Sequence, residues 1–338
     1  MPIALDATYS LGRNLSGVGV YSRQMLFGLA RAHPEENFQF CYRSHRILRS
    51  LGDALPRNAT RRLLTGVPQA DLFHALNQRV DFRARRTVTT FHDLFVMTGE
   101  YSEAEFRRRF AEQARQAADR SDLIIAVSHF TASQIEQLLR VGMDRIRVVP
   151  HGIRAPDRIA KARENLVLCV GAIQRRKNIA RLVRAFERLP ARWRLALAGA
   201  ADGFGASEEL RAVEESLRRG DIDVLGYVSN AELDALYQRA SIFAFPSLDE
   251  GFGMPVLDAM AHGVPVVTSK RSALPEVAGD AALLIDPQDV DALADALSRL
   301  ACDDALREDL ARRGLERTST FTWESAVERT WAVYDELR

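Results

Sequence analysis

The sequence predicts an α/β protein made of two doubly wound, parallel-sheet (Rossmann-like) domains. Short apolar runs alternate with helical segments along the chain, and continuous apolar runs of this kind are typical of strands buried on both faces of a parallel sheet. The pattern occurs twice, in halves of about 150 residues each, which is the usual size of one domain. The full length of 338 residues also exceeds what one ordinary core needs.

The expected strands follow one another in order. In the first half they cover residues 2–5, 38–42, 71–76, 87–91, 123–127 and 146–150. In the second half they cover residues 166–171, 194–199, 222–227, 241–247, 264–269 and 281–286. The segments between them are predicted helices, as in residues 289–301, where apolar side chains follow one helical stripe.

The domain boundaries follow from this order. We expect an N-terminal domain over residues 1–155 and a C-terminal domain over 165–320, joined by a polar linker near residues 151–165. Residues 321–338 form a last helix with two tryptophans on one face, which need a large surface to cover them. The residues themselves do not decide which domain this helix covers.

Composition favours a cytoplasmic globular protein. The chain is 47% apolar and 27% charged, and no apolar run approaches the roughly 18–20 residues that span a bilayer. The first residues lack a basic region followed by an apolar core, so no secretory signal is expected. The three cysteines lie far apart, which fits a reducing compartment and predicts neither disulfides nor a zinc site.

The charge is divided unevenly between the halves. Residues 1–160 hold 23 arginines, no lysine and 16 acids, which leaves 23 basic and 29 acidic residues for the remainder. The basic residues gather in segments 43–64 and 105–116. Such a half favours an anionic partner, namely nucleic acid, a phosphorylated substrate or an acidic membrane surface. The alternative is a solvated face in an arginine-rich protein.

The stretch FPSLDEGFGMPVLDAMAHG combines features of a ligand site. A strand leads into a glycine turn and then into a helix with proline in its first turn, where proline is favoured. Gly251 and Gly253 permit close approach of a ligand, and a helix start suits phosphate. Glu250 ends the strand and Asp258 lies about one turn into the helix, and carboxylates accept well from sugar hydroxyls. The alternative is that both acids complement the helix dipole.

This stretch resembles the signature of the retaining glycosyltransferases of family GT4, which have the GT-B fold of two domains facing a cleft. That signature is Glu, seven residues, Glu, and here Asp258 stands at its second position. The resemblance implies that Glu250 fixes sugar hydroxyls, that Asp258 reaches for the ribose, and that the helix start binds the donor's phosphates. The donor contacts then lie at Glu250, Gly251, Phe252, Gly253, Met254 and Asp258. It also implies that the C-terminal helix crosses back to the first domain.

The stretch VGAIQRRKNIARLVRAF resembles the family's strand, loop and helix that bind the donor. The resemblance implies that Gly171, Arg176 and Lys177 lie at the donor's pyrophosphate. Two cations suit a leaving diphosphate that gains charge. Many members carry another arginine where this chain has Ala172, so Arg175 or a neighbour is expected to take its part.

Four further segments resemble the family. TVTTFHDLF implies that His92 lies beside the donor sugar. SGVGVYSRQML resembles a first glycine loop followed by a helix, in which Gly17 and Gly19 admit phosphate or acceptor. LGYVSNAELDALY implies that Tyr227 and Val228 meet the nucleotide base. In VVPHGI the histidine stands where asparagine is common.

The predicted function is therefore sugar transfer with retention from a nucleoside-diphosphate sugar, with GDP-mannose as the expected donor. The acceptor is a glycan or a lipid-linked oligosaccharide bound by the N-terminal domain. His92, Glu250, Arg176 and Lys177 are the expected catalytic residues, acting by positioning and leaving-group stabilisation. The sequence offers no well-placed nucleophile, which favours substitution from the front face.

Metal and partner predictions complete this hypothesis. Two Asp-x-Asp triplets, at 221–223 and 289–291, are common by chance, and we expect no metal and no cofactor. The basic half is expected to touch an anionic membrane surface, at the inner membrane, and no nucleic acid. Alternatives are a sugar-nucleotide epimerase of the same fold and an inactive sugar-nucleotide-binding module. A glucan phosphorylase needs a lysine for pyridoxal, and a nicotinamide dehydrogenase needs a GxGxxG motif that we do not find.

Overall fold

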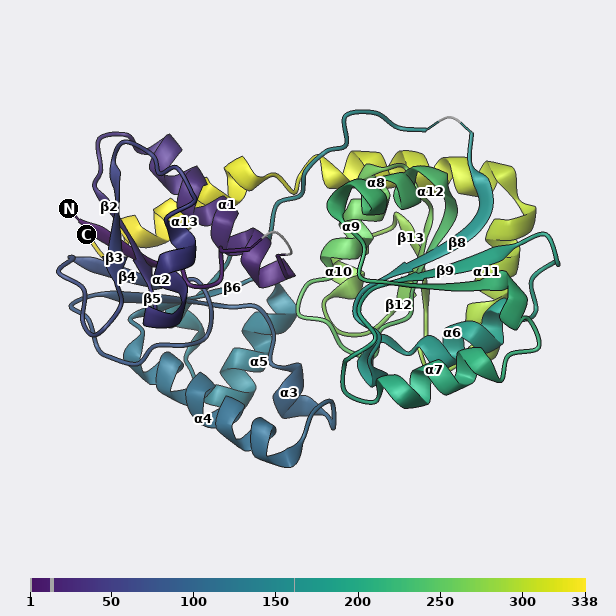
Figure 1. Ribbon diagram of the computed structural model, residues 1–338, viewed down its shortest axis with the longest axis horizontal. Helices are drawn as coiled ribbons and strands as arrows, with labels where there is room; N and C mark the ends of the chain where they lie inside the picture. Colours follow the sequence, from purple (N-terminus) through teal and green to yellow (C-terminus); the bar gives the residue numbers. More distant parts are fainter. Residues whose placement is uncertain (1, 13–14, 161) are drawn as a thin grey trace. The chain divides into compact units, whose positions relative to one another are not determined.

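The computed structural model describes residues 2–12, 15–160 and 162–338. The chain divides into two compact units, and Figure 1 colours it from purple at the N-terminus to yellow at the C-terminus. Unit 1 contains Met1–Gly99, Ala104–Gly152 and Phe321–Arg338, and unit 2 contains Glu100–Glu103 and Ile153–Thr320. The chain therefore leaves unit 1 after Gly152 and returns to it with its last segment.

Unit 1 is built on a seven-stranded sheet of order β3-β2-β1-β4-β5-β6-β7, in which every pair is parallel. Its strands are β1 (Ile3–Asp6), β2 (Phe38–Tyr42), β3 (Ala59–Leu63), β4 (Leu72–Ala75), β5 (Thr87–Phe91), β6 (Leu123–Ala126) and β7 (Ile146–Val148). Its helices are α1 (Gly17–Ala32), α2 (Ser44–Ser50), α3 (Phe95–Thr98), α4 (Ala104–Arg120), α5 (His129–Leu139), the 3-10 turn η1 (Met143–Arg145) and α13 (Trp323–Asp335).

Unit 2 is built on a six-stranded parallel sheet of order β10-β9-β8-β11-β12-β13. Its strands are β8 (Glu164–Val170), β9 (Arg194–Ala198), β10 (Ile222–Gly226), β11 (Ala240–Phe245), β12 (Val266–Ser269) and β13 (Ala282–Ile285). Its helices are α6 (Ile179–Phe186), α7 (Ala206–Glu214), α8 (Asn230–Arg239), α9 (Met254–Ala261), α10 (Leu274–Ala278), α11 (Val290–Cys302) and α12 (Asp304–Thr318), with 3-10 turns η2 (Arg175–Lys177) and η3 (Arg219–Asp221). Helices α6 and α11 pack on one face of the sheet, and α8 and α9 lie against the other (Figure 1).

The predicted fold class is confirmed, and all twelve predicted strands are present with ends within two residues of the prediction. The sequence did not predict β3. This strand, ATRRL, lies at the edge of its sheet, and only Ala59 in it is buried. It therefore lacks the apolar run that marks the central strands. Among the described residues, no helix combines the length and apolar character that crossing a bilayer requires.

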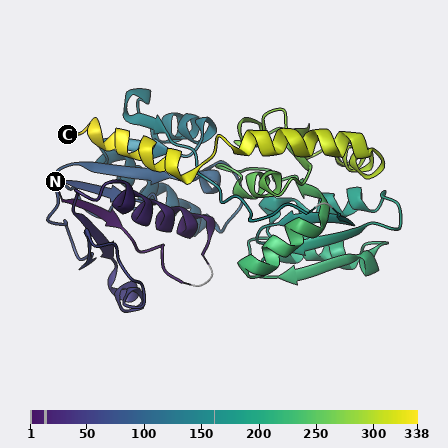
Figure 2. The same cartoon turned by 90° about the horizontal axis from the view of Figure 1, so that it is seen from above.

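The last helix, α13, packs beside α1 in unit 1, as Figure 2 shows. The Trp331 ring stacks on His33 with centroids 3.4 Å apart. The Tyr334 hydroxyl lies 2.6 Å from Nδ1 of His74 on β4. The crossing implied by the family resemblance is therefore present. Trp323 is buried near Tyr21 of α1, and the half-buried Trp331 stacks on His33, so both tryptophans pack within unit 1.

Candidate active site

In unit 2, predicted site residues follow the carboxyl ends of β8 and β11. These two strands are neighbours at the point where the strand order reverses. Ligands of open α/β sheets bind outside the carboxyl ends of the strands at such a switch point. After β8 the chain runs through Gly171 into η2, and after β11 it runs through Glu250 into α9.

Arg176, Lys177 and Glu250 form a buried ion cluster at this point. Glu250 Oε1 lies 2.7 Å from Nη1 of Arg176 and 2.6 Å from Nζ of Lys177. The three side chains are 9%, 9% and 11% exposed in that order. Burial alone would raise the pKa of Glu250, but the charges of Arg176 and Lys177 outweigh it and hold this pKa at about 2. One carboxylate thus serves two cations, and the cluster keeps a net positive charge.

Two glycines permit close packing beside the ion cluster, one against Lys177 and one against the backbone. Gly171 has φ 140°, and a Cβ there would lie 3.0 Å from Cε of Lys177. Gly199, at the end of β9, has φ 155°, and its Cβ would lie 2.0 Å from the carbonyl oxygen of Gly171. Both backbone conformations are rare for residues with a side chain. The close approach of the two strand ends therefore requires glycine at both positions.

Asn178 ties η2 to the segment that carries Glu250. Its Nδ2 donates to the carbonyls of Pro246, at 3.0 Å, and Pro287, at 2.7 Å. Its own backbone is left-handed, with φ 62°. The backbone N–H of Leu248 donates to the carbonyl of Arg176 at 2.8 Å. These bonds fix the two cations against Glu250. Sequence reasoning missed Asn178, although it directly follows the Arg-Lys pair.

The glycine turn before α9 is also fixed from outside. The backbone N–H of Glu250 donates to Oγ of Ser272 at 3.0 Å. Gly253 has φ 104°, and a Cβ there would lie 2.6 Å from Cδ2 of Leu274. Gly251, Phe252 and Gly253 are buried, and Met254 begins α9 with a proline after it. The turn and helix start are built as predicted, and their contacts with phosphate stay a prediction.

Asp258 lies half-buried on α9. It is not part of the ion cluster that Arg176, Lys177 and Glu250 form in the described part of the chain. Burial, and next the charge of Asp234, raise the pKa of Asp258 to about 7. The Asp258 carbonyl accepts from Nδ1 of His262 at 2.7 Å. The two acids of the signature thus differ in kind, because Glu250 is held ionised and Asp258 titrates near neutral pH.

Three other predicted donor residues lie around this edge of the sheet. Tyr227 and Val228 directly follow β10, and the Tyr227 side chain is 53% exposed. Arg175 pairs with Glu208 of α7 at 2.7 Å and lies over the Phe204 ring. Arg175 therefore does not join the ion cluster in this arrangement, and the contact of Tyr227 and Val228 with a base stays a prediction.

In unit 1, His92 follows β5 and is buried with both ring nitrogens engaged. Nε2 lies 2.9 Å from the carbonyl oxygen of Leu76, and Nδ1 lies 3.5 Å from Nε2 of His151. A carbonyl only accepts, so Nε2 of His92 carries the proton and Nδ1 accepts from His151. Burial lowers the pKa of His92 to about 4, so the ring is neutral at neutral pH. Its action on the donor sugar stays a prediction.

An aromatic cluster holds this histidine pair. The Tyr21 ring of α1 lies edge-on to His92 and to His151, with centroids 4.7 and 4.9 Å away. The Trp323 ring, at the start of α13, lies 6.1 Å from His151. Sequence reasoning noted only that a histidine replaces asparagine at position 151. The pairing with His92 was not readable, because 59 residues separate the two.

The predicted glycine loop at the start of α1 is wrong in one respect. Gly17 and Gly19 lie in the first turn of the helix rather than in a loop before it. Ser16 is the N-cap, and its Oγ accepts from the N–H of Gly19 at 3.3 Å. A Cβ at Gly19 would lie 3.0 Å from the carbonyl oxygen of Tyr9, which explains why glycine is needed there.

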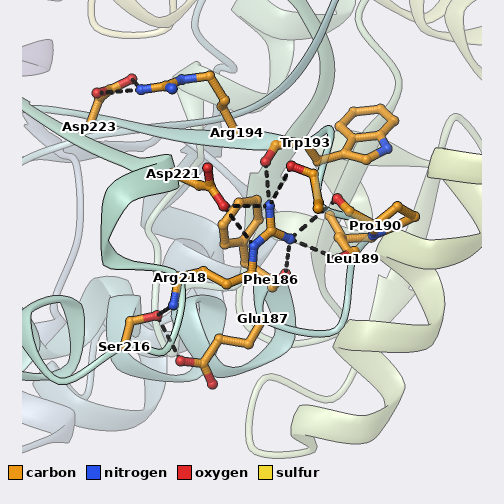
Figure 3. Close-up of polar contacts among 11 residues, drawn as sticks. Phe186, Glu187, Leu189, Pro190, Trp193, Arg194, Ser216, Arg218, Asp221 and Asp223 are labelled. Carbon is orange, nitrogen blue, oxygen red and sulfur yellow. Dashed lines mark hydrogen bonds and ion pairs between the residues drawn. The ribbon is translucent and has the colours of Figure 1, made fainter.

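The Asp-x-Asp triplets are accounted for by other contacts. Asp221 pairs with Arg218 at 2.9 Å, and Asp223 pairs with Arg194 at 3.0 Å, as Figure 3 shows. In the second triplet, Asp289 caps α11 and Asp291 pairs with a surface arginine. Each acid therefore has a structural role in the fold.

Two family models match the chain. The model for "Glycosyl transferases group 1" matches residues 155–317, and the model for "Glycosyltransferase Family 4" matches residues 14–155. O-antigen chain mannosyltransferase B of Escherichia coli is 35% identical over 280 residues, which cover 78% of this chain and 74% of that protein. This chain belongs to the group 1 glycosyltransferases.

Solved structures agree with this membership at the level of the fold. Sucrose-phosphate synthase from Thermosynechococcus elongatus has a TM-score of 0.81 at 22% identity and covers 100% of this chain and 99% of its own. Anabaena HepE, solved with UDP-glucose, has a TM-score of 0.73 at 17% identity, with 99% of each chain covered. The glycosyltransferase has the GT-B fold. Some other curated relatives are longer, and the chain spans 31–32% of their length.

The geometry of this glycosyltransferase fits charge stabilisation at the carboxyl edge of unit 2. A diphosphate that leaves a sugar gains negative charge, and two buried cations beside a helix start oppose that charge. Because both cations are largely shielded from water, their attraction for a negative charge is stronger than it would be in water. Glu250, held ionised between them, is an acceptor that can also bind hydroxyl groups.

Proposed function

We propose that this glycosyltransferase moves mannose with retention from GDP-mannose to a glycan or lipid-linked acceptor in the synthesis of a surface polysaccharide. The observation that carries the proposal is the 35% identity, over most of both chains, to an enzyme named as an O-antigen chain mannosyltransferase. HepE, of the same fold, binds UDP-glucose, which supports a nucleotide-sugar donor in general.

Unit 2 would bind the donor and unit 1 the acceptor. On this proposal Arg176 and Lys177 bind the pyrophosphate, with Gly171 close beside them, and the turn from Gly251 to Met254 adds backbone N–H groups. Glu250 then accepts from hydroxyls of the sugar while it keeps its bond to Lys177.

Arg176 and Lys177 would stabilise the negative charge on GDP as it departs. The bond from the anomeric carbon to the phosphate oxygen breaks, and the anomeric carbon becomes positively charged. The acceptor hydroxyl attacks from the face that GDP leaves and passes its proton to the departing phosphate oxygen. Asp258 would accept from a ribose hydroxyl, with Tyr227 and Val228 at the base. His92, neutral and fixed by His151, would contact the sugar as a positioning group rather than as an acid.

The proposal is tested with purified protein, oligomannoside acceptors and a panel of GDP-, UDP-, dTDP- and ADP-sugars. Release of GDP from GDP-mannose and an α-mannoside product by NMR are expected, because GDP-mannose is itself the α-anomer. Preference for another sugar nucleotide would overturn the donor assignment, and a β-mannoside would overturn retention. Recovery of an epimerised sugar without any glycoside would point instead to the epimerase alternative.

We also propose that the transfer needs no metal and no other cofactor, because two protein cations stand where a metal would neutralise the diphosphate. Turnover should persist in excess EDTA. Loss of turnover that Mg²⁺ or Mn²⁺ restores would contradict this part of the proposal.

A cytoplasmic enzyme with a lipid-linked acceptor would work at the anionic inner leaflet. Unit 1 carries a surface that suits it around α2, where Leu48 and Leu51 are 79% and 65% exposed beside Arg46 and Arg49. Exposed leucines between arginines fit the boundary of an anionic bilayer. Sedimentation with phosphatidylglycerol vesicles at low salt should carry the protein down, and Leu48→Asp should weaken this. Equal recovery with neutral vesicles would contradict the membrane contact.

A further inference from the structure

Unit 2 has a cavity near the amino ends of β8 and β9. The cavity measures about 410 Å³. Its floor is apolar, with Leu166 of β8, Ala196 of β9 and Leu236 of α8. Its charged lining consists of Glu164, Arg194, Asp223 and Arg239, which pair with one another, together with Arg163 and Arg192.

Four residues of the charged lining form two bidentate ion pairs. Nη2 of Arg194 lies 3.0 Å from both carboxylate oxygens of Asp223, a pair drawn in Figure 3. Nε and Nη2 of Arg239 lie 2.7 and 2.9 Å from the carboxylate of Glu164. A guanidinium has five N–H groups and a carboxylate about four lone-pair sites. Each pair therefore keeps donors and acceptors to spare, and all four side chains are roughly half exposed.

A partly buried arginine holds the loop that leads into β9 beside the cavity. Arg218 donates to the carbonyls of Leu189, at 2.7 Å, and Trp193, at 2.6 Å, and lies 4.5 Å above the Phe186 ring. Figure 3 shows this guanidinium at the centre of the loop that follows α6. The loop carries Arg194 to the cavity. The position of Arg194 is thus set before any ligand arrives.

The end of α8 is held in the same way. Nη1 of Arg163 donates to the carbonyls of Tyr237 and Ala240, each at 2.9 Å, at the end of α8. Burial lowers the pKa of this guanidinium, yet its carbonyl partners keep it paired. Arg163 therefore fixes the end of α8, which brings Leu236 and Arg239 to the cavity.

This cavity is separate from the ion cluster at Glu250. Glu164 and Arg194 are the first residues of β8 and β9, whereas Gly171 and Gly199 follow the last residues of the same strands. Strands of this length, at about 3.3 Å per residue, place the two ends about 20 Å apart. A ligand in the cavity would leave the donor centre accessible.

We propose that this cavity is an accessory saccharide site that holds a short stretch of glycan on unit 2. The apolar floor suits the C–H face of a sugar ring, and the spare donors and acceptors of the charged lining suit its paired hydroxyls. At Arg194 or Arg239, a simple anion would have to displace Asp223 or Glu164 from its arginine. The class of ligand rests on the proposed function, since a glycan is what this enzyme would extend.

The test is saturation-transfer NMR of the full chain with linear mannose oligosaccharides and, in parallel, glucose oligosaccharides. We expect wild-type binding at millimolar concentration, and about tenfold weaker binding in Arg194→Ala and in Arg239→Ala, since each loses hydrogen bonds to a charged group. Arg188→Ala is the matched control, because Arg188 pairs with Asp291 on the surface of unit 2 outside the cavity. It should bind like the wild type.

Three outcomes would overturn the accessory site. They are no binding of any oligosaccharide, equal binding by Arg194→Ala and Arg188→Ala, and displacement of the oligosaccharide by millimolar inorganic phosphate, which would show an anion site. GDP binding is measured on the same samples, because loss of GDP binding with intact oligosaccharide binding would contradict the proposed donor and not this site. Preference for glucose oligomers would contradict the mannosyl assignment alone.

Discussion

Glu250 stands between two buried cations, so its charge decides how strongly they attract a second anion. In Glu250→Gln the cluster gains one positive charge. We expect GDP binding to be retained or to tighten severalfold, and turnover to fall by at least about a hundredfold, because the sugar loses a charged acceptor. Calorimetric GDP titration and initial rates measure the two effects. Arg184→Ala, an exposed change on α6, is the control.

A variant that turned over GDP-mannose at the wild-type rate would contradict the role given to Glu250. A variant that lost both GDP binding and its melting transition would report misfolding, because an unpaired buried cation is costly. Circular dichroism on the same samples separates these results.

Asp258 should make stability depend on pH. Its folded-state pKa of about 7 exceeds the ordinary value of 3.8, so the folded chain holds this proton where the unfolded chain releases it. The stability that the protonated, uncharged Asp258 permits is fully present below about pH 4. It is lost as the pH rises to about 7, because the buried carboxyl must then be charged. Asp258→Asn should therefore gain roughly 1–2 kcal/mol relative to wild type between pH 4.5 and pH 8. Urea unfolding at both pH values measures this difference, and parallel curves for the two proteins would refute it.

The sequence predicted the charged residues of the site but not the residues that hold them in place. The Arg-Lys pair and Glu250 were readable because their spacing follows a family signature, and the structure brings them together. Asn178, Ser272 and His151 were not readable as partners, because their bonds join segments far apart in the chain. Nothing in one sequence specifies such contacts.

At the scale of the elements, the strand ends around the ion cluster depend on glycine. In Gly199→Ala the new Cβ would lie 2.0 Å from a backbone carbonyl oxygen, at a φ that side chains rarely adopt. We expect a loss of about 2–4 kcal/mol in the free energy of unfolding, and weaker GDP binding. Gly220→Ala is the matched control, with nothing within 4 Å of its Cβ and no positive φ. Equal urea midpoints for the two variants would show that the close packing of the ends of β8 and β9 does not contribute to stability.

The central strands were predictable because burial on both faces leaves apolar runs. The edge strand β3 was not, because only its first residue is buried and it has no apolar run. The first turn of α1 was predicted as a loop because SGVGVYSRQML resembles the family's glycine loop followed by a helix. In the structure the helix already begins at Gly17, after the N-cap Ser16, and Gly19 fits the tight space beside Tyr9.

At the scale of the whole molecule, the chain closes unit 1 with its last helix. Removal of residues 321–338 would expose α1 and leave His74 without Tyr334. We expect hydrogen exchange in β4, β5 and α1 to rise strongly, while β8, β9 and β11 of unit 2 keep their protection. Mass-spectrometric exchange on the truncated and full chains measures this. Unchanged protection in unit 1 would mean that α13 contributes little to its stability.

The division into two units was readable from the repeated α/β pattern. The tryptophans of the last helix indicated that it packs on a surface but not on which one, and only the family resemblance implied that it returns to unit 1. The partner surface on α1 and β4 is formed from residues about 300 positions earlier in the chain, such as Met25, whose sulfur meets Thr330.

The measurement that tests the central claim most directly is a thermal-shift panel of GDP, UDP, dTDP and ADP on wild type, Arg176→Ala and Arg184→Ala. A ligand that binds only the folded state raises the melting temperature. We predict that GDP raises it most in wild type and in Arg184→Ala, and much less in Arg176→Ala. Equal shifts in all three proteins, or no shift with any diphosphate, would contradict a donor site at Arg176, Lys177 and Glu250.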